Sequence, residues 1–287
     1  MQHPHRFILT LSCPDARGIV HRVTGFLAQH GGFILESAQF GDEDTERFFM
    51  RVDFALERGD VSLESLSANF SAEVAHPFAM RWQMVPKARK SRVLIMVSQH
   101  GHCLHDLLYR VSTGQLPVEV PAIISNHDAL EPIASHYQIP FHHWPVGESS
   151  KLSQEKSVLA LMEKESIDLL VLARYMQILS PAMCEQVAGR AINIHHSFLP
   201  SFKGAKPYQQ AYMRGVKLIG ATAHYVTTDL DEGPIIEQEV ARVDHTQTPD
   251  ELSAMGRDIE SMVLARAVKY HSEHRVFLNG QKTVVFK

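Results

Sequence analysis

Two polar side chains that could do chemistry lie in one short stretch, residues 191–200. The first half of this stretch alternates apolar and polar residues and carries Asn193 and His195, and the second half ends at a proline. Because the side chains of a strand point alternately to its two faces, Asn193 and His195 share one face. An amide and an imidazole side by side at the carboxyl end of a buried strand can stabilise an oxygen anion. We therefore predict a strand over residues 191–195 that presents both side chains to a reacting oxygen.

A carboxylate that could complete such a site lies in a second segment, residues 220–236. Asp231 stands shortly before a Gly-Pro turn at residues 233–234. A carboxylate, an imidazole and an amide together supply acid–base chemistry and stabilisation of an oxyanion, and they need no metal. Asp231, His195 and Asn193 are therefore the candidate catalytic residues.

Each candidate also has a purely structural interpretation. Asn193 could satisfy the backbone of a turn, and Asp231 could merely start one. We expect His224, which begins an apolar strand face, to be a packed core histidine. His195 and His196 could form a metal pair, but no HExxH motif or carboxylate at ligand spacing accompanies them. We therefore expect no metal.

The composition is that of an ordinary globular protein. The chain has 287 residues, of which 45% are hydrophobic and 21% charged, and its net charge is -4; this length suffices for two domains. The absence of a basic footprint argues against nucleic acid as a partner. The longest apolar run, residues 169–173, is far too short to span a bilayer. Three cysteines without CxxC spacing, and an N-terminus without a signal-peptide core, predict a cytoplasmic protein with free thiols.

The first 85 residues predict a small domain of mixed α and β structure. Strand and helix patterns follow one another in the order strand, helix, strand, strand, helix, strand, which is the ferredoxin-like arrangement. The expected strands are residues 6–12, 33–40, 47–56 and 77–85, and the expected helices are one from residue 19 to a Gly-Gly stop and one over residues 61–73. A charged, proline-led segment, residues 86–92, is the predicted linker.

Residues 93–287 predict a second, catalytic domain in which strands alternate with helices. The expected strands are residues 93–98, 118–125, 139–144, 167–173, 191–195, 217–226 and 234–243, and the expected helices are 102–112, 129–137, 154–164, 208–213 and a long one from a capping box at 248–251 to about 273, before a hairpin over 275–286. Unalternating apolar strands suit a parallel sheet covered on both faces. The fold class is thus α/β, with a Rossmann-like, mostly parallel sheet and a site at the strand carboxyl ends. No GxGxxG motif or P-loop is present, so no nucleotide cofactor is expected.

The motifs around the candidate catalytic residues resemble the signature of the folate-dependent formyltransferases. The matching residues are Asn193, His195, Ser197 to Pro200 and Gly204 in one segment, His224 to Val226, Asp231, Gly233 and Gln238 in another, and the folate-binding-like stretch Leu172 to Pro181. The resemblance covers residues 92–286. It implies that Asn193, His195 and Asp231 carry the chemistry and that a formylated folate is the substrate, with no separate cofactor.

The same resemblance implies where the pterin ring docks. It should lie against the backbone of residues 177–179, hence Gln177 and Leu179, and against the loop of residues 226–231, hence Val226 and Thr228. These four residues are the candidate substrate-binding residues.

Two departures from the glycinamide ribonucleotide formyltransferases select a branch of the family. Residues 99–102, Gln-His-Gly-His, stand where those enzymes have a glycine-rich phosphate cradle, and Gln177 stands where they have an arginine. The phosphate site of an amine acceptor is therefore missing. The resemblance implies a water acceptor and hydrolysis of 10-formyltetrahydrofolate to tetrahydrofolate and formate, which would supply formate for purine synthesis and balance the one-carbon folate pool.

For this reaction we expect Asp231 to position and deprotonate the water, directly or through a relay, with a pKa modestly raised by partial burial. A protonated His195 would donate to the formyl oxygen, and Asn193 would add a second hydrogen bond. Formyl transfer to an amine, such as a sugar nucleotide or an aminoacyl-tRNA, is the alternative enzyme activity. A folate- or amino-acid-sensing module without activity is the alternative of a different class.

The N-terminal domain carries a second resemblance. Residues 14–20, followed by the Gly-Gly pair at 31–32, look like the ACT domain. That likeness implies a homo-oligomer and an amino-acid effector. Ligand sensing and plain dimerisation are left open as roles of this domain.

Overall fold

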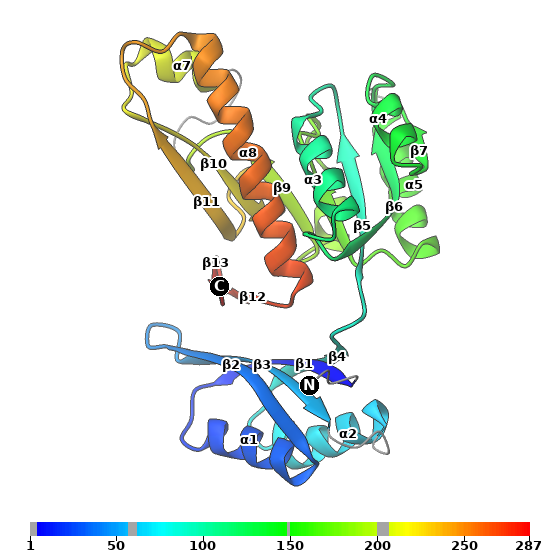
Figure 1. Ribbon diagram of the computed structural model, residues 1–287, viewed down its shortest axis with the longest axis vertical. Helices are drawn as coiled ribbons and strands as arrows, with labels where there is room; N and C mark the ends of the chain where they lie inside the picture. Colours follow the sequence, from blue (N-terminus) through cyan, green and yellow to red (C-terminus); the bar gives the residue numbers. More distant parts are fainter. Residues whose placement is uncertain (1–4, 57–61, 148–149, 200–206) are drawn as a thin grey trace. The chain divides into compact units, whose positions relative to one another are not determined.

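The computed structural model describes residues 5–56, 62–147, 150–199 and 207–287 and shows two compact units (Figure 1). The first unit comprises Met1–Lys90, Glu273–Asn279 and Val284–Lys287, and the second comprises Ser91–Ser272 and Gly280–Thr283. The sequence placed everything after residue 92 in the second domain, whereas the structure assigns most of the C-terminal hairpin to the first unit. Pro200 and Gly204, two residues of the formyltransferase-like signature, lie outside the described residues.

The first unit is built on a four-stranded antiparallel sheet with the strand order β2-β3-β1-β4. Its elements in chain order are β1 (Arg6–Pro14), α1 (Ile19–Gln29), β2 (Gly32–Asp42), β3 (Arg47–Leu56), α2 (Leu63–Phe70), a π-helical turn η1 (Ser71–Ala75) and β4 (Arg81–Pro86). The buried face of α1 packs with strand residues such as Leu9 and Leu11 in one hydrophobic core. The predicted ferredoxin-like order is confirmed.

The other side of β3 carries residues that contact the C-terminal part of the chain. The hairpin β12 (Val276–Asn279) and β13 (Lys282–Val285) forms where the sequence predicts one. The ring of Phe277 packs edge-on against Phe49 with centroids 5.8 Å apart. Arg51 donates to the carbonyl of Glu273 at 3.2 Å, and Asn279 donates to the buried Asp42. These side-chain contacts explain why residues 273–279 belong to the first unit.

The second unit is built on a seven-stranded sheet with the order β11-β10-β9-β8-β5-β6-β7. Its elements are β5 (Ser91–Val97), α3 (His102–Ser112), β6 (Val118–Ser125), α4 (Glu131–His136), β7 (Phe141–His143), α5 (Lys151–Lys164), β8 (Leu169–Leu172), α6 (Pro181–Gln186), β9 (Ala191–His195), α7 (Pro207–Met213), β10 (Leu218–Tyr225), β11 (Ile235–Arg242) and α8 (Pro249–Ser272). The pairs from β7 to β9 are parallel, and β10 is antiparallel to both its neighbours. The predicted mostly parallel sheet is confirmed.

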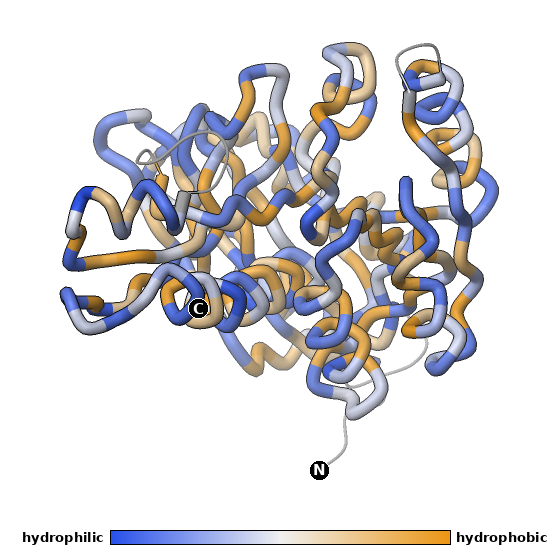
Figure 2. Tube along the Cα trace, turned by 90° about the horizontal axis from the view of Figure 1, so that it is seen from above, coloured by the Kyte–Doolittle hydropathy of each residue, from blue (hydrophilic) through white to orange (hydrophobic). Residues whose placement is uncertain are grey.

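Helices cover both faces of this sheet, because its central strands are apolar throughout. In β5, Leu94 and Met96 join a core with α5 and α6, while Val93, Ile95 and Val97 on the opposite face are equally buried. The long helix α8 packs against β9, β10, β11 and α3. Figure 2 shows hydrophilic residues concentrated in the turns and loops. No helix of the described residues is long and apolar enough to cross a membrane.

Candidate active site

The strand β9 delivers two of the predicted catalytic side chains to the centre of the sheet. It lies between β8, to which it is parallel, and β10, to which it is antiparallel. The pairing register sets Asn193 opposite His224, so their side chains lie on one face of the sheet. The side-chain nitrogen of Asn193 lies 3.3 Å from Nε2 of His224. The carboxyl ends of β8 and β9 lie next to each other here because the two strands are parallel neighbours.

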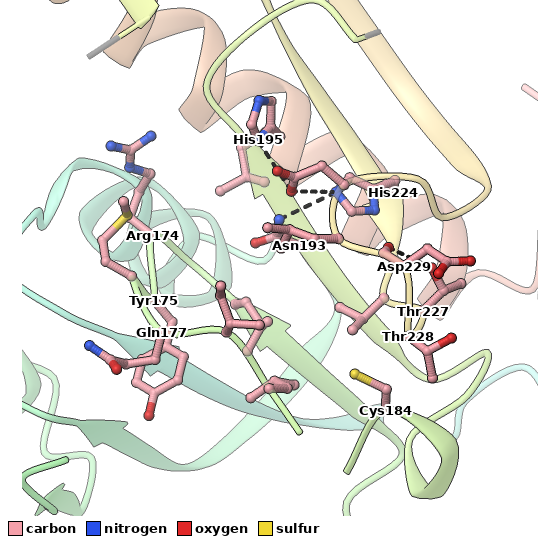
Figure 3. Close-up of a pocket in the computed structure, with 18 of the residues that line it drawn as sticks. Arg174, Tyr175, Gln177, Cys184, Asn193, His195, His224, Thr227, Thr228 and Asp229 are labelled. Carbon is pink, nitrogen blue, oxygen red and sulfur yellow. Dashed lines mark hydrogen bonds and ion pairs between the residues drawn. The ribbon is translucent and has the colours of Figure 1, made fainter. Parts of the chain in front are cut away.

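Asp231 reaches this face from the loop between β10 and β11. A Cβ at Gly233 would come within 1.7 Å of the Tyr225 carbonyl oxygen, so only glycine lets the loop fold back on β10. Asp231 has a left-handed backbone with φ of 57°. Its Oδ1 lies 3.3 Å from Nδ1 of His195 and 3.8 Å from Nε2 of His224. Figure 3 shows His195, His224 and Asn193 close to one another at one end of a pocket.

The electrostatics of Asp231 differ from the sequence-based expectation. Burial alone would raise the pKa of its carboxyl, but hydrogen bonds and charge from His195 and His224 outweigh burial and hold the pKa well below its usual range. The expected modest rise is therefore wrong. Asp231 is ionised at neutral pH, and it favours a proton on Nδ1 of His195. The other ring nitrogen, Nε2 of His195, is buried and makes no hydrogen bond to any residue that the structure describes.

His224 is part of this constellation, which corrects the expectation of a simple core histidine. It is buried, at 3% exposure, but its Nδ1 lies 2.9 Å from the carbonyl oxygen of Tyr225. That partner requires a hydrogen on Nδ1, so Nε2 of a neutral ring accepts from Asn193, whereas Nε2–H of a protonated ring pairs with Asp231. His224 thus orients Asn193. The sequence could not reveal this, because the contact depends on the register between β9 and β10.

All seven predicted site residues line one cavity of ≈ 270 Å³. The catalytic candidates on its wall are Asn193, His195 and Asp231, and Figure 3 shows Asn193 and His195 at one end. The substrate-binding candidates on the same cavity are Gln177, Leu179, Val226 and Thr228. The walls are mostly side chains and backbone of the loops after β8 and β10, and the volume suits the insertion of one flat heterocycle.

A second polar cluster, which the sequence did not predict, adjoins the cavity through Arg174. Its centre is Glu260 of α8, whose side chain is 1% exposed. Nε2 of His102 lies 2.8 Å from one carboxylate oxygen, and the Tyr208 hydroxyl donates to the other at 2.7 Å. Nη1 of Arg174 lies 3.4 Å from Glu260. The stretch 99–102 therefore places His102 in an internal ion pair.

This cluster also contains the group of metal-ligating side chains found among the described residues. Ligand atoms of His102, Cys103 and Glu260 lie within 4.8 Å of one another. The set fits a metal ion poorly, because Glu260 is already engaged by His102 and Tyr208 and faces the positive charge of Arg174. Burial also raises the pKa of the Cys103 thiol, which opposes the thiolate that a metal would need.

Comparison with a family profile agrees with this fold and site. The profile described as "Formyl transferase" matches residues 91–268, which include all of the site residues named above. The chain belongs to the formyl transferase family.

Relatives that match the whole chain narrow the class. The formyltetrahydrofolate deformylases of Corynebacterium sp. (strain P-1) and Bacillus subtilis (strain 168) are 50% and 48% identical to it, over 100% and 97% of this chain and 100% and 93% of theirs. The crystal structure of the deformylase from Burkholderia mallei ATCC 23344 is 51% identical, with a TM-score of 0.94 over 99% of this chain and 100% of that one. Within the formyl transferases, the chain belongs with the formyltetrahydrofolate deformylases.

Proposed function

We propose that this protein hydrolyses 10-formyltetrahydrofolate to tetrahydrofolate and formate. The observation that carries the proposal is the Asp231–His195 pair, because both residues line a cavity sized for a heterocycle and Nε2 of His195 has no hydrogen-bond partner among the described residues. Kinship supports water as the acceptor. Deformylases match the chain from end to end, whereas a phosphoribosylglycinamide formyltransferase from Anaplasma phagocytophilum covers 69% of it at 30% identity.

In this proposal the formyl oxygen lies against Nε2 of His195. The ionised Asp231 holds Nδ1 of the ring, so a protonated ring donates from Nε2 to the oxygen as it becomes an oxyanion. Asn193, oriented by His224, donates a second hydrogen bond from its amide. Both donors lie on the same sheet face, and this preorganisation lowers the energy of the tetrahedral intermediate.

Water attacks the formyl carbon from the side of the Asp231 carboxylate. The low pKa of Asp231 makes it a weak base on its own, so we assign the proton to the coupled pair of Asp231 and His195 rather than to the carboxylate alone. The C–N bond of the intermediate then breaks. One proton of the water reaches the departing nitrogen, and the other is released when the formic acid ionises, so the products are the free amine of tetrahydrofolate, formate and a proton.

The pterin is proposed to dock on the walls formed by residues 176–179 and 226–230. Rigid backbone amides of these loops can pair with the donor and acceptor edges of the ring, and Gln177 and Thr228 add polar side chains. Leu179 and Val226 supply apolar contact. The folate is the substrate, and the proposal needs no cofactor.

We further propose that the reaction occurs in the cytoplasm, where it would supply formate for purine synthesis; three buried free cysteines suit a reducing compartment. Homo-oligomerisation and an amino-acid effector at the N-terminal unit stay predictions from the ACT resemblance.

Formate release from 10-formyltetrahydrofolate in an amine-free buffer tests the proposed function. We expect stoichiometric formate and tetrahydrofolate with the wild-type protein. If formate appears only after an amine is added, or the formyl group is recovered on that amine, the protein is a transferase. If neither occurs, the assigned activity is wrong.

A further inference from the structure

Arg174 follows β8 directly and has an unusual backbone for its type. Its φ is 64°, in the left-handed region that a glycine would occupy at lower cost. A non-glycine residue in that region is uncommon, and such strained positions concentrate at functional sites. The local conformation therefore favours a role for the side chain that glycine could not perform.

The guanidinium of Arg174 is buried yet incompletely bonded. Its side chain is 10% exposed, and neither Nε nor Nη1 has a hydrogen-bond partner in the described part of the chain. Buried donors are almost always paired, so each exception calls for an explanation. Among the described residues, five buried side-chain atoms lack a partner, and three of them belong to Arg174 and His195.

These two residues line the same cavity. Figure 3 shows the Arg174 guanidinium and the His195 ring at the same end of the pocket, away from the Gln177 amide. His196, which lines the same cavity, has its ring centroid 5.1 Å from that of His195. Burial, followed by the nearby charge of Arg174, lowers the pKa of His196 to about 3. The charge of Arg174 therefore acts at the catalytic end of the cavity.

The ion pair with Glu260 does not account for the unpaired donors. Both oxygens of Glu260 already accept hydrogen bonds, from His102 and Tyr208. Nη1 of Arg174 lies 3.4 Å from this carboxylate without a hydrogen bond to it. Glu260 thus attracts the guanidinium by charge, and the hydrogens on Nε and Nη1 stay without an acceptor among the described residues.

We propose that Arg174 and Nε2 of His195 together form a binding site for a formate-sized carboxylate at the catalytic end of the cavity. The inference rests on the proposed function, because formate is the product of that hydrolysis. The Nε–H of Arg174 can donate to one oxygen of the carboxylate and Nε2–H of a protonated His195 to the other, and the guanidinium charge adds electrostatic attraction. Formation of the anion from a neutral formyl amide would then strengthen its contact with Arg174 as the C–N bond breaks.

Direct binding of ¹³C-formate to the folate-free protein, followed by NMR titration, tests the site. We expect saturable binding to the wild-type protein and a loss of roughly tenfold or more in affinity for Arg174→Gln. Arg174→Lys keeps the positive charge but lacks the Nε–H donor, so its affinity for formate should lie between those of the wild type and Arg174→Gln. Arg110→Gln, which removes an arginine paired with Asp106 on the surface of α3, is the matched control and should bind as the wild type does.

Equal formate binding by Arg174→Gln and the wild type would overturn the proposal, as would equal binding of chloride and formate. A third measurement needs no variant. Formate should shift a buried arginine Nε–H signal of the wild-type protein, and the absence of such a shift would also overturn the proposal. The arms separate the two claims. Formate binding that depends on Arg174, without hydrolysis of the folate, would reject the proposed function and keep the site. Hydrolysis of the folate without formate binding that depends on Arg174 would keep the proposed function and reject the formate site.

Discussion

Asp53 in the first unit and Asp231 in the second each lie between two basic side chains, and the two carboxylates differ in an informative way. In the first unit, Asp53 on β3 has a 1% exposed side chain and ion pairs with Arg6 and Lys87 at 2.6 and 2.5 Å. In the second, Asp231 is 12% exposed and lies 3.3 Å from His195. Burial alone would raise the pKa of both carboxyls. Hydrogen bonds and charge from the basic partners together outweigh burial, so both pKa values end below the usual range.

The difference lies in the partners and not in the carboxylates. The partners of Asp53 are an arginine and a lysine, residue types that do not serve as general bases near neutral pH, so Asp53 is held in place. The partners of Asp231 are imidazoles, the side chains most often used for general acid–base catalysis, and Nε2 of His195 has no hydrogen-bond partner among the described residues. A lowered pKa therefore does not mark a catalytic carboxylate. A proton-exchanging partner with a free atom at a cavity wall does.

Among the proposed variants, Asp231→Asn should lower the kcat of formate release most. The amide keeps the shape of the side chain but cannot hold the proton on Nδ1 of His195 or take part in moving the proton from water. We expect the kcat of formate release to fall about 10³–10⁴-fold. Near-wild-type turnover would show that Asp231 is as structural as Asp53.

His195→Gln removes the imidazole and leaves a neutral amide. The formyl oxygen loses its charged donor, so kcat should fall about 10²–10³-fold. Steady-state formate production, with thermal unfolding as a check of the fold, measures this. Retained activity would contradict the oxyanion role.

His224→Gln tests a positioning residue. It removes the acceptor that orients the Asn193 amide, which should lower kcat roughly tenfold, about the effect of one hydrogen bond. KM should change little, because the pterin contacts are untouched. A large rise in KM with unchanged kcat would mean that His224 acts on substrate binding.

The pH dependence of stability sharpens the comparison, because both carboxyls have a folded-state pKa below the unfolded value of about 3.9. The unfolded chain therefore binds more protons just below that value. Both contributions are complete above about pH 4 and are lost as the pH falls through the lower folded pKa values. Urea unfolding of the wild type should weaken below about pH 4, and either Asp→Asn variant should weaken less. An acid limb of kcat nearer neutral pH would belong to a histidine.

Asp53→Asn should have the smallest effect on catalysis and is the matched control for Asp231→Asn. Arg6 and Lys87 remain partly exposed to solvent, at 38% and 41%, so their stranded charges are hydrated. We expect unchanged kcat and a loss of about 1–3 kcal/mol in the free energy of unfolding, measured with urea. A parallel loss of activity would contradict the division of roles between the two carboxylates.

Much of the fold could be predicted from local patterns. The strands at residues 118–125 and 191–195 and the helix at 102–112 form over the residues expected, because apolar periodicity and turn residues mark their ends. Weaker patterns did less well. The six-residue helix α6 was not predicted, and β4 begins at Arg81 rather than residue 77, since residues 71–75 continue the preceding helix as a π turn.

For the candidate site, the sequence by itself determined which residue types are available and that Asn193 and His195 share a face, because strand periodicity is local. Only the tertiary structure decided what those residues touch. The register of β9 against β10 brings His224 to Asn193, and the fold of the loop brings Asp231 to two histidines and lowers its pKa against burial. The guanidinium of Arg174 likewise lies beside Glu260, which is distant in sequence, while its Nε and Nη1 make no hydrogen bond to a described residue. Proton affinity and hydrogen-bond pairing depend on distances across the fold, and linear spacing does not encode those distances.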